Sequence, residues 1–293
     1  MRRRLAMPDM PGQDDALVQL ISKALLQSAG GLSALASEVG ELLRESFDGV
    51  IKTPKTGRRL YEELEKTEKT HIGTCVEIEL RHRLQLARGK VLDCEIAGVE
   101  VDIKFSVGTS WMIPPEAFDQ PCIIISADDT NARCWFGVFI AKSEYLNKGN
   151  RDEKCSINRL GRDNIRWLLE NHPYPANFWQ SVPREIANKI ASGSSGNARV
   201  ITLFTEIQDR PIIRKVIEDV AAQKDFMRRV RADKGRGTRN QLAKHSIVLL
   251  SGGWSGTKEF IAALGLPTLG QSEFMSHRVK GNEVALAKRL GLL

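Results

Sequence analysis

The stretch that decides the fold runs from Val91 to Val107 and reads VLDCEIAGVEVDIKFSV. Apolar and polar residues alternate in two segments separated by Ala97-Gly98, which is the pattern of an antiparallel hairpin with a two-residue loop. Side chains along a strand point to opposite faces in turn. In the second segment one face carries Val99, Val101, Ile103, Phe105 and Val107, and the other carries Glu100, Asp102, Lys104 and Ser106. The alternation therefore separates an apolar face of this strand from a polar one.

The polar face of this hairpin gathers acidic residues. A turn at Ala97-Gly98 sets three pairs opposite each other, namely Ile96 and Val99, Glu95 and Glu100, and Asp93 and Asp102. Opposed residues have Cβ atoms roughly 4.5–5.5 Å apart, and like charges there destabilise a sheet. Four carboxylates beside Lys104 are costly unless a cation lies between them, and oxygen ligands suit Mg²⁺ or Mn²⁺. The pattern predicts a nuclease metal site, and an ordinary solvent-facing sheet is the alternative.

An Asp-x-Lys triplet alone is not specific, because Asp152-Glu153-Lys154 repeats it in this chain. The second copy lies in a polar stretch without strand pattern and is interpreted as a solvated loop. The five cysteines form no CxxC pair and read as reduced thiols of a cytosolic protein. The basic N-terminus lacks the apolar segment of a signal peptide, and no apolar run approaches the roughly 20 residues of a membrane helix. We therefore expect a cytoplasmic protein with no membrane partner.

Length and charge suggest two domains with different partners. The 293 residues exceed the prior of about 150 per domain. Residues 200–293 hold 16 of the 43 Lys and Arg and 9 of the 36 Asp and Glu, a net of +7; the remaining 27 of each sign cancel over residues 1–199. The basic excess therefore lies entirely in the last third, which favours a nucleic-acid or membrane partner for that part.

The first part of the chain predicts one α/β layer domain. Apolar spacing indicates helices over 15–46, interrupted at Gly30-Gly31, a short one from about Leu60, and another from His71 to Leu86. After the hairpin, residues 122–127 and 134–141 are nearly continuous apolar runs, typical of strands buried on both faces. A helix around 158–170 is expected to close the domain. The predicted boundaries are 1–170 for this domain, 171–178 for a Pro-containing linker and 179–293 for a basic domain.

In the basic domain the pattern predicts a long helix over 211–232, a basic loop, and a helix-turn-helix over 257–281 with its turn at Gly265. A solvated helix face is the alternative interpretation of the basic run, and a plain αα-hairpin that of the helix pair. Eleven residues are candidate DNA contacts. They are Arg228, Arg229, Arg231, Lys234, Arg236, Arg239, Gln271, Ser272, His277, Arg278 and Lys280.

The chain resembles the NaeI family of type II (type IIE) restriction endonucleases. The resemblance rests on the spacing Glu77-x15-Asp93-x8-Asp102-x-Lys104, the lead-in EKTEKTHIGT with Thr67, and the linker before a basic domain. It implies a PD-(D/E)xK nuclease domain, with a mixed sheet and flanking helices, joined to a mainly helical, winged-helix or helix-turn-helix DNA-binding domain. It also implies a homodimer that binds two copies of double-stranded DNA, one as substrate and one as effector.

The resemblance further implies that Asp93, Asp102 and Glu77 serve the metal, Lys104 the attacking water and Thr67 the surroundings of the site. The main-chain carbonyl of Ile103 is a plausible further ligand. Mg²⁺ is the expected cofactor, with Mn²⁺ as a substitute. Glu95 and Glu100 remain rivals of Asp93 as ligands, and one or two metal ions could act. Glu77 could equally form a plain ion pair with Arg81.

The expected activity is metal-dependent hydrolysis of DNA at a short sequence, for which family likeness favours a GC-rich palindrome. The alternative is a non-catalytic DNA-binding regulator whose N-terminal domain only dimerises. Such a regulator would not need Asp93, Asp102 and Lys104 on one strand face.

Overall fold

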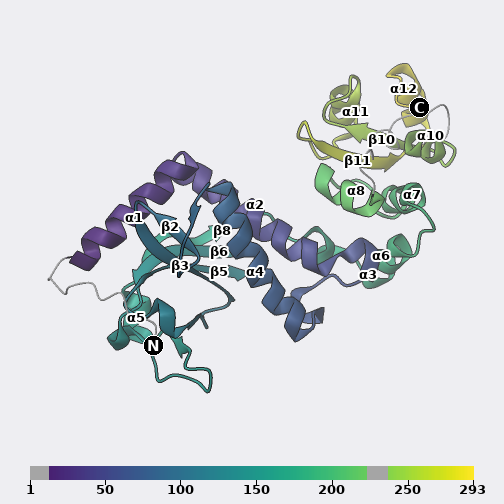
Figure 1. Cartoon of the computed structure of the whole chain (residues 1–293). Coiled ribbons are helices and arrows are strands. Elements are labelled where there is room, and N and C mark those ends of the chain that lie inside the picture. The colour runs from purple at the N-terminus through teal and green to yellow at the C-terminus, as the bar shows by residue number, and fades with distance from the viewer. Residues whose placement is uncertain (1–12, 223–236) are drawn as a thin grey trace. The chain divides into compact units, whose positions relative to one another are not determined.

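The computed structural model describes residues 13–222 and 237–293 (Figure 1). The chain divides into two compact units. The first contains the chain up to Ile51 together with Leu60–Asn177, and the second contains Lys52–Arg59 and Phe178–Leu293. The division after Asn177 falls inside the segment expected to be a linker, although a strand occupies the beginning of that segment. The sequence pattern did not predict that Lys52–Arg59, which lies within the first part of the chain, belongs to the second unit.

Three long helices build one side of the first unit. They are α1 (Gln13–Ala29), α2 (Leu32–Ile51) and α4 (Lys66–Arg83), and the short η1 (Tyr61–Glu63) precedes α4. Gly30 and Gly31 separate α1 from α2 with φ values of 86° and 114°, a region that glycine enters without steric cost. The interruption expected at this pair is confirmed. In α4 the Glu68 side chain accepts the N–H of Glu65, which begins the helix with a capping box.

A six-stranded mixed sheet forms the centre of the first unit. Its order is β1-β2-β3-β5-β6-β8, with β3 parallel to β5 and the other neighbours antiparallel. A separate pair joins β4 (Met112–Ile113) to β7 (Cys155–Ser156). The strands of the large sheet are β1 (Ala87–Arg88), β2 (Cys94–Ile96), β3 (Val99–Val107), β5 (Pro121–Asp128), β6 (Arg133–Ile140) and β8 (Arg166–Pro173).

The predicted hairpin is formed by β2 and β3. Ile96 pairs with Val99 and Glu95 with Glu100, as the two-residue turn requires. Ala97 and Gly98 have φ values of 52° and 78°, the left-handed pair that matches the twist of the strands. The buried strands expected over 122–127 and 134–141 are confirmed as β5 and β6.

The helix predicted over 158–170 is wrong in its second half. Helix α5 spans only Arg159–Asp163, after which β8 pairs antiparallel with β6. The Asn158 side chain caps the helix by accepting the N–H of Gly161. Leu169 lies opposite Phe136 in the sheet, so a partner more than 30 residues away imposes the strand on an apolar pattern that fits a helix equally well.

Two apolar cores cover the two faces of the large sheet. Helices α1, α2 and α4 pack on one face, where Phe47 and Val76 meet Val101 and Ile103 of β3 (Figure 1). The opposite face carries a smaller core around Trp111, Ile124 and Phe139. The apolar residues of β3 therefore anchor the strand in the helix-facing core. Asp102 and Lys104 alternate with them along the strand and so point to the opposite face.

The second unit combines short helices with a three-stranded antiparallel sheet of order β10-β11-β9. Its helices α3 (Thr53–Thr56) and α6 (Arg184–Ala191) contact each other. The remaining elements are η4 (Phe178–Ser181), α7 (Gly196–Glu206), β9 (Ile212–Ile213), α8 (Arg214–Ala221), α10 (Thr238–Ala243), β10 (Ile247–Ser251), α11 (Thr257–Leu264), β11 (Glu273–Arg278) and α12 (Asn282–Arg289).

Two predictions for this unit are wrong. The second helix expected within 257–281 is strand β11, because Phe274, Met275 and Ser276 are buried against β10. The long helix expected over 211–232 begins later, as α8, and ends at Ala221, since Ala222 adopts a left-handed conformation with φ 49°. Residues 223–232 of that expected helix lie outside the described part of the chain.

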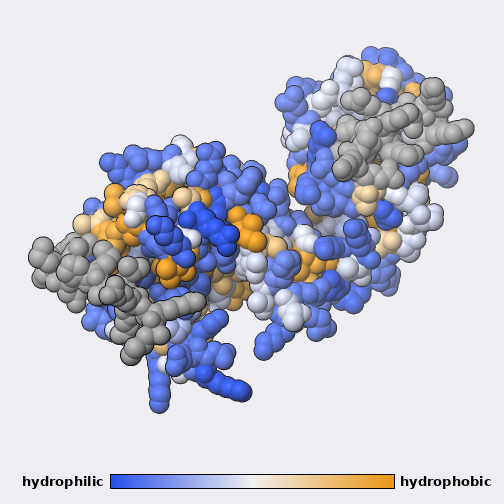
Figure 2. All heavy atoms as spheres, in the orientation of Figure 1, coloured by the Kyte–Doolittle hydropathy of each residue, from blue (hydrophilic) through white to orange (hydrophobic). Residues whose placement is uncertain are grey.

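All five cysteines are free thiols. Among residues 13–222 and 237–293, no helix is both long and apolar enough to cross a membrane. Hydrophilic side chains cover most of the face shown in Figure 2, with smaller apolar patches between them.

Candidate active site

Asp93, Asp102 and Lys104 converge at the base of the hairpin. The Lys104 Nζ lies 2.7 Å from Asp102 Oδ2 and 3.6 Å from Asp93 Oδ2. The Asp102 side chain is only 5% exposed, whereas those of Asp93 and Lys104 are about one-fifth exposed. The cluster thus combines one buried carboxylate with a carboxylate and a cation that are both partly exposed to solvent.

The backbone of β3 holds Asp93 in this arrangement. Asp93 precedes β2, and its Oδ2 accepts the main-chain N–H of Ile103 at 2.7 Å. Ile103 itself is buried in the helix-facing core, which fixes the donor. The Ile103 carbonyl accepts from Lys104 Nζ at 3.0 Å and so faces the same space as the carboxylates. Both neighbours of Ile103 in sequence are site residues, and alternation along one strand brings them together.

The electrostatics of the cluster are unbalanced. Burial raises the pKa of Asp102 to about 7, against the lowering effect of Lys104, and nearby Asp93 adds to the rise. Burial acts to lower the pKa of Lys104, but Asp102 and then Asp93 raise it above its ordinary value. The lysine is therefore protonated. When Asp102 and Asp93 are both ionised it neutralises only one of the two charges, and the remaining negative charge favours an additional cation.

Glu77 extends the cluster from helix α4. Burial, followed by the proximity of Asp93, raises the pKa of Glu77, while Lys104 and Arg81 oppose that rise. Glu77 therefore faces Asp93 as well as the expected ion-pair partner Arg81. Thr67 is different, because it lies exposed in the first turn of the same helix. Ten residues of helix place it about 15 Å from Glu77 along the axis.

The donor set fits a hard divalent cation. In the described part of the chain no three His, Cys, Asp or Glu side chains lie close enough to form a complete metal cage. Mg²⁺ does not need such a cage, since it keeps several waters and binds through one or two carboxylates together with substrate phosphate. Asp93 and Asp102 supply two carboxylates, and the Ile103 carbonyl adds a third oxygen ligand. The Lys104 ammonium contacts all three groups.

The two glutamates left open as rival ligands have different surroundings. The Glu100 carboxylate accepts main-chain N–H groups of Val91 at 2.9 Å and Leu92 at 2.7 Å, and that of Lys90 as well. Burial acts to raise the pKa of Glu100, but these three bonds lower it, and they engage both carboxylate oxygens. Glu95 lies between Glu100 and Ala87 in the sheet. The sequence pattern did not predict that Glu100 binds the backbone of residues 90–92, because N–H groups carry no sequence signal.

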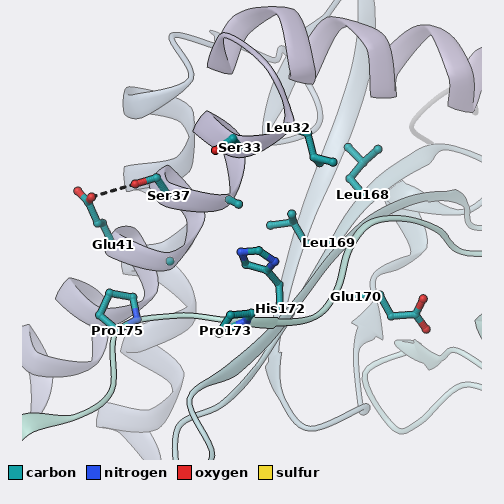
Figure 3. Close-up of a pocket in the computed structure, with 12 residues that line it drawn as sticks. Leu32, Ser33, Ser37, Glu41, Leu168, Leu169, Glu170, His172, Pro173 and Pro175 are labelled. Atoms are coloured by element: carbon teal, nitrogen blue, oxygen red, sulfur yellow. Dashed lines mark hydrogen bonds between the residues drawn. The ribbon is translucent and has the colours of Figure 1, made fainter.

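A hollow in the first unit lies away from these carboxylates. It measures about 570 Å³ and lies between α2 and β8, with Leu32, Leu168 and His172 in its wall (Figure 3). Ser37 donates to Glu41 beside it at 3.2 Å. β8 is three strands from β3 in the sheet, about 14 Å at the usual spacing. The hollow and the carboxylate cluster are therefore separate features of the first unit.

The candidate DNA contacts of the second unit fall into three groups. Gln271, Ser272, Arg278 and Lys280 are exposed, although Arg278 also donates to the His245 carbonyl at 2.9 Å. Arg239 stacks on Trp254 and donates to the Gly291 carbonyl, and His277 lies between Asp209 and Glu283 at 2.6 and 3.4 Å, so both have internal partners. Arg228, Arg229, Arg231, Lys234 and Arg236 lie outside the described residues.

Comparison with known proteins places these features in a family. The family model described as restriction endonuclease NaeI matches residues 31–287. The chain belongs to the NaeI restriction endonuclease family. It is similar to the type II restriction enzyme NaeI of Lentzea aerocolonigenes, with 36% identity over 246 residues that cover 81% of this chain and 77% of the relative. The match includes both units, and family members are site-specific DNA endonucleases.

Proposed function

We propose that the protein is a metal-dependent restriction endonuclease that hydrolyses phosphodiester bonds of double-stranded DNA. Its proposed active site consists of Asp93, Asp102 and Lys104. The observation that carries this proposal is the approach of Lys104 Nζ to both carboxylates. A Mg²⁺ ion, or Mn²⁺ in its place, would polarise the phosphate and lower the pKa of bound water. Asp93, Asp102 and the Ile103 carbonyl would hold it, with Glu77 beside Asp93.

The side chains perform the remaining steps of the proposed reaction. Asp102 must be ionised to contribute a ligand, so the metal-bound state requires its proton to leave. Lys104 is a protonated, mobile point charge, and it can orient the attacking water and stabilise the negative charge that develops on the phosphate oxygens. Its position two residues from Asp102 on one strand face directs both groups to the same phosphate.

Plasmid cleavage tests this proposal. Purified protein should nick or linearise plasmid DNA at one sequence with Mg²⁺ and do nothing when the metal is chelated. Asp93→Ala should lose the cleavage, whereas Asp152→Ala, in an exposed turn, should cut at the parental rate. Specific DNA binding without cleavage under every metal condition would favour the regulator instead. Mapping the cut ends gives the recognition site, for which we propose a short GC-rich palindrome.

We further propose that the second unit is a winged-helix DNA-binding domain. Among the described residues the order is α7, β9, α8, α10, β10, α11, β11, and the pairing of β11 with both other strands supports such a domain. On this assignment α8 and α10 form the helix pair, and the segment between β10 and β11, including α11, forms the wing. The DNA-facing helix is then α10 rather than residues within 257–281.

An effector role of this domain gives a kinetic expectation. If DNA bound to the second unit activates the first, a one-site plasmid is cut slowly and an uncleavable oligonucleotide with the site accelerates the cut. Arg278 and Lys280 are exposed, and replacing both with Ala should weaken binding and lower the salt slope by about one per lost phosphate contact. Full-speed cleavage of the one-site plasmid that does not respond to the oligonucleotide would contradict the effector role.

We propose a homodimer as the active form, which sedimentation of the free protein tests.

A further inference from the structure

The turn that leads into Asp93 is held by an acidic side chain from the neighbouring strand. Residues Gly89–Leu92 connect β1 to Asp93. Glu100 of β3 accepts three consecutive main-chain N–H groups of this turn, those of Lys90, Val91 and Leu92. A carboxylate that binds several backbone N–H groups forms charge-assisted hydrogen bonds, roughly twice as strong as neutral ones. Glu100 therefore acts as a clamp on the turn.

The turn itself is too tight for a side chain at its first position. A Cβ atom on Gly89 would lie 2.4 Å from the Leu92 carbonyl oxygen and 3.1 Å from that of Cys94. Only glycine allows this approach, so the chain folds back closely enough for its N–H groups to point at one carboxylate. The three donated N–H groups therefore belong to the residues that directly precede Asp93 in the chain.

The backbone is thereby fixed to β3 on the approach to Asp93, and the Asp93 side chain is fixed to the same strand. Glu100 holds the three preceding N–H groups, and the N–H of Ile103 holds Asp93 Oδ2 at 2.7 Å. Lys104 completes the set with its ammonium 3.6 Å from Asp93. Since Asp102 lies on this strand as well, one rigid element sets the separation between the two carboxylates.

We propose that Glu100 is a positioning residue that fixes Asp93 for metal binding through the backbone of residues 90–92, and is not itself a ligand. The inference rests on the proposed function of the Asp93 and Asp102 cluster. It also explains how an acidic residue is tolerated opposite Glu95, where like charges destabilise the sheet. The three N–H groups compensate the charge of Glu100.

Amide exchange and metal titration of the full chain test this inference. In Glu100→Ala the amides of Lys90, Val91 and Leu92 should exchange at least about tenfold faster, because their acceptor is gone. Loss of a group that orients a ligand typically lowers metal affinity about 10- to 100-fold, so calorimetric Mn²⁺ affinity should fall in that range. Glu100→Gln keeps one acceptor oxygen and should give intermediate values for both.

A matched control is available at the β5–β6 turn. Asp128 also holds a turn, because it accepts the side-chain amide of Asn131 at 2.7 Å and the main-chain N–H of Asn131 at 3.1 Å. The side-chain hydrogen bond, together with the backbone bonds, lowers the pKa of Asp128. Asp128 lies six residues along β5 from the partner of Asp102, about 20 Å away. Asp128→Ala should free its own turn and leave the Mn²⁺ affinity at the parental value.

The outcomes separate the inference from the proposed function. Faster exchange at residues 90–92 with parental Mn²⁺ affinity would overturn the positioning role and leave Glu100 as a structural clamp. Unchanged exchange would overturn the clamp. A parent protein that binds no Mn²⁺, with or without DNA, would overturn the proposed metal site itself, and the positioning role with it.

Discussion

Two clusters of the first unit are built from the same kinds of charge and serve different ends. In one, Lys104 contacts Asp102 and Asp93. In the other, Arg44 of α2 lies 2.7 Å from Asp129 and 2.8 Å from Asp48, and the Tyr174 hydroxyl donates to Asp129 at 3.0 Å. Each has one cation and two carboxylates, so composition alone does not distinguish them.

The cation and its exposure distinguish them. Each cluster has one buried and one partly exposed carboxylate, Asp129 and Asp48 in one and Asp102 and Asp93 in the other. The Arg44 side chain, however, is 7% exposed, whereas that of Lys104 is 21% exposed. Arginine is planar, always charged and directed at fixed partners, which suits a structural link between α2, the end of β5 and the segment after β8. Lysine is a mobile point charge, and Lys104 is partly exposed beside an aspartate whose pKa burial raises to about 7. A partly exposed lysine beside an aspartate that can lose its proton near neutral pH therefore marks the candidate site, whereas the number of charges does not.

The largest effect is expected at the structural cluster. Arg44→Leu leaves Asp129 buried without its cation, and breaking a buried pair in this way costs about 3–5 kcal/mol of unfolding free energy. Urea denaturation measures the loss. Cleavage per folded molecule should stay near the parental value, and a variant that unfolds normally but no longer cuts would erase the distinction between the clusters.

Lys104→Ala should give the converse result. Removing one electrostatic group aimed at a transition state typically lowers the rate about 10²- to 10³-fold. Single-turnover cleavage at saturating Mg²⁺ should fall in that range, while the urea midpoint shifts far less than in Arg44→Leu. A variant that cuts normally would remove Lys104 from the reaction.

The pH dependence should follow Asp102. Because protons compete with metal for a carboxylate whose pKa is about 7, cleavage at subsaturating Mg²⁺ should fall up to tenfold per pH unit below that value. Arg44 keeps its charge throughout this range, so its cluster adds no such dependence. A rate that is flat from pH 5 to 8 at limiting Mg²⁺ would contradict the assignment.

The smallest effect concerns stability without metal. Burial raises the pKa of Asp102 from 3.8 to about 7, so the folded state binds more protons than the unfolded state between those values. The Asp102 contribution must therefore become less favourable as pH rises from about 4 to about 7. Comparing urea titrations of the parent and Asp102→Asn isolates this slope, which the asparagine variant should lack. An identical pH dependence in both proteins would argue against the raised pKa.

Sequence reasoning succeeded where interactions are local and failed where they are distant. The register of β2 and β3 follows from the two-residue turn and runs as predicted from Ile96–Val99 to Glu95–Glu100. The strand pairing ends at Cys94–Val101, and Asp93, which precedes β2, interacts with Asp102 just beyond it. Strands β8 and β11 were taken for helices, because each depends on a partner far along the chain. The buried bond between Arg44 and Asp129 joins residues 85 positions apart, and no periodicity reveals it.

The central claim is that ionised Asp102 holds the metal that cleaves DNA. Asp102→Asn tests it most directly, since the side chain keeps its shape and loses only the charge. We predict that this variant binds DNA carrying the recognition site with parental affinity and cuts none of it at any Mg²⁺ or Mn²⁺ concentration. Cleavage by Asp102→Asn at the parental rate would contradict the account.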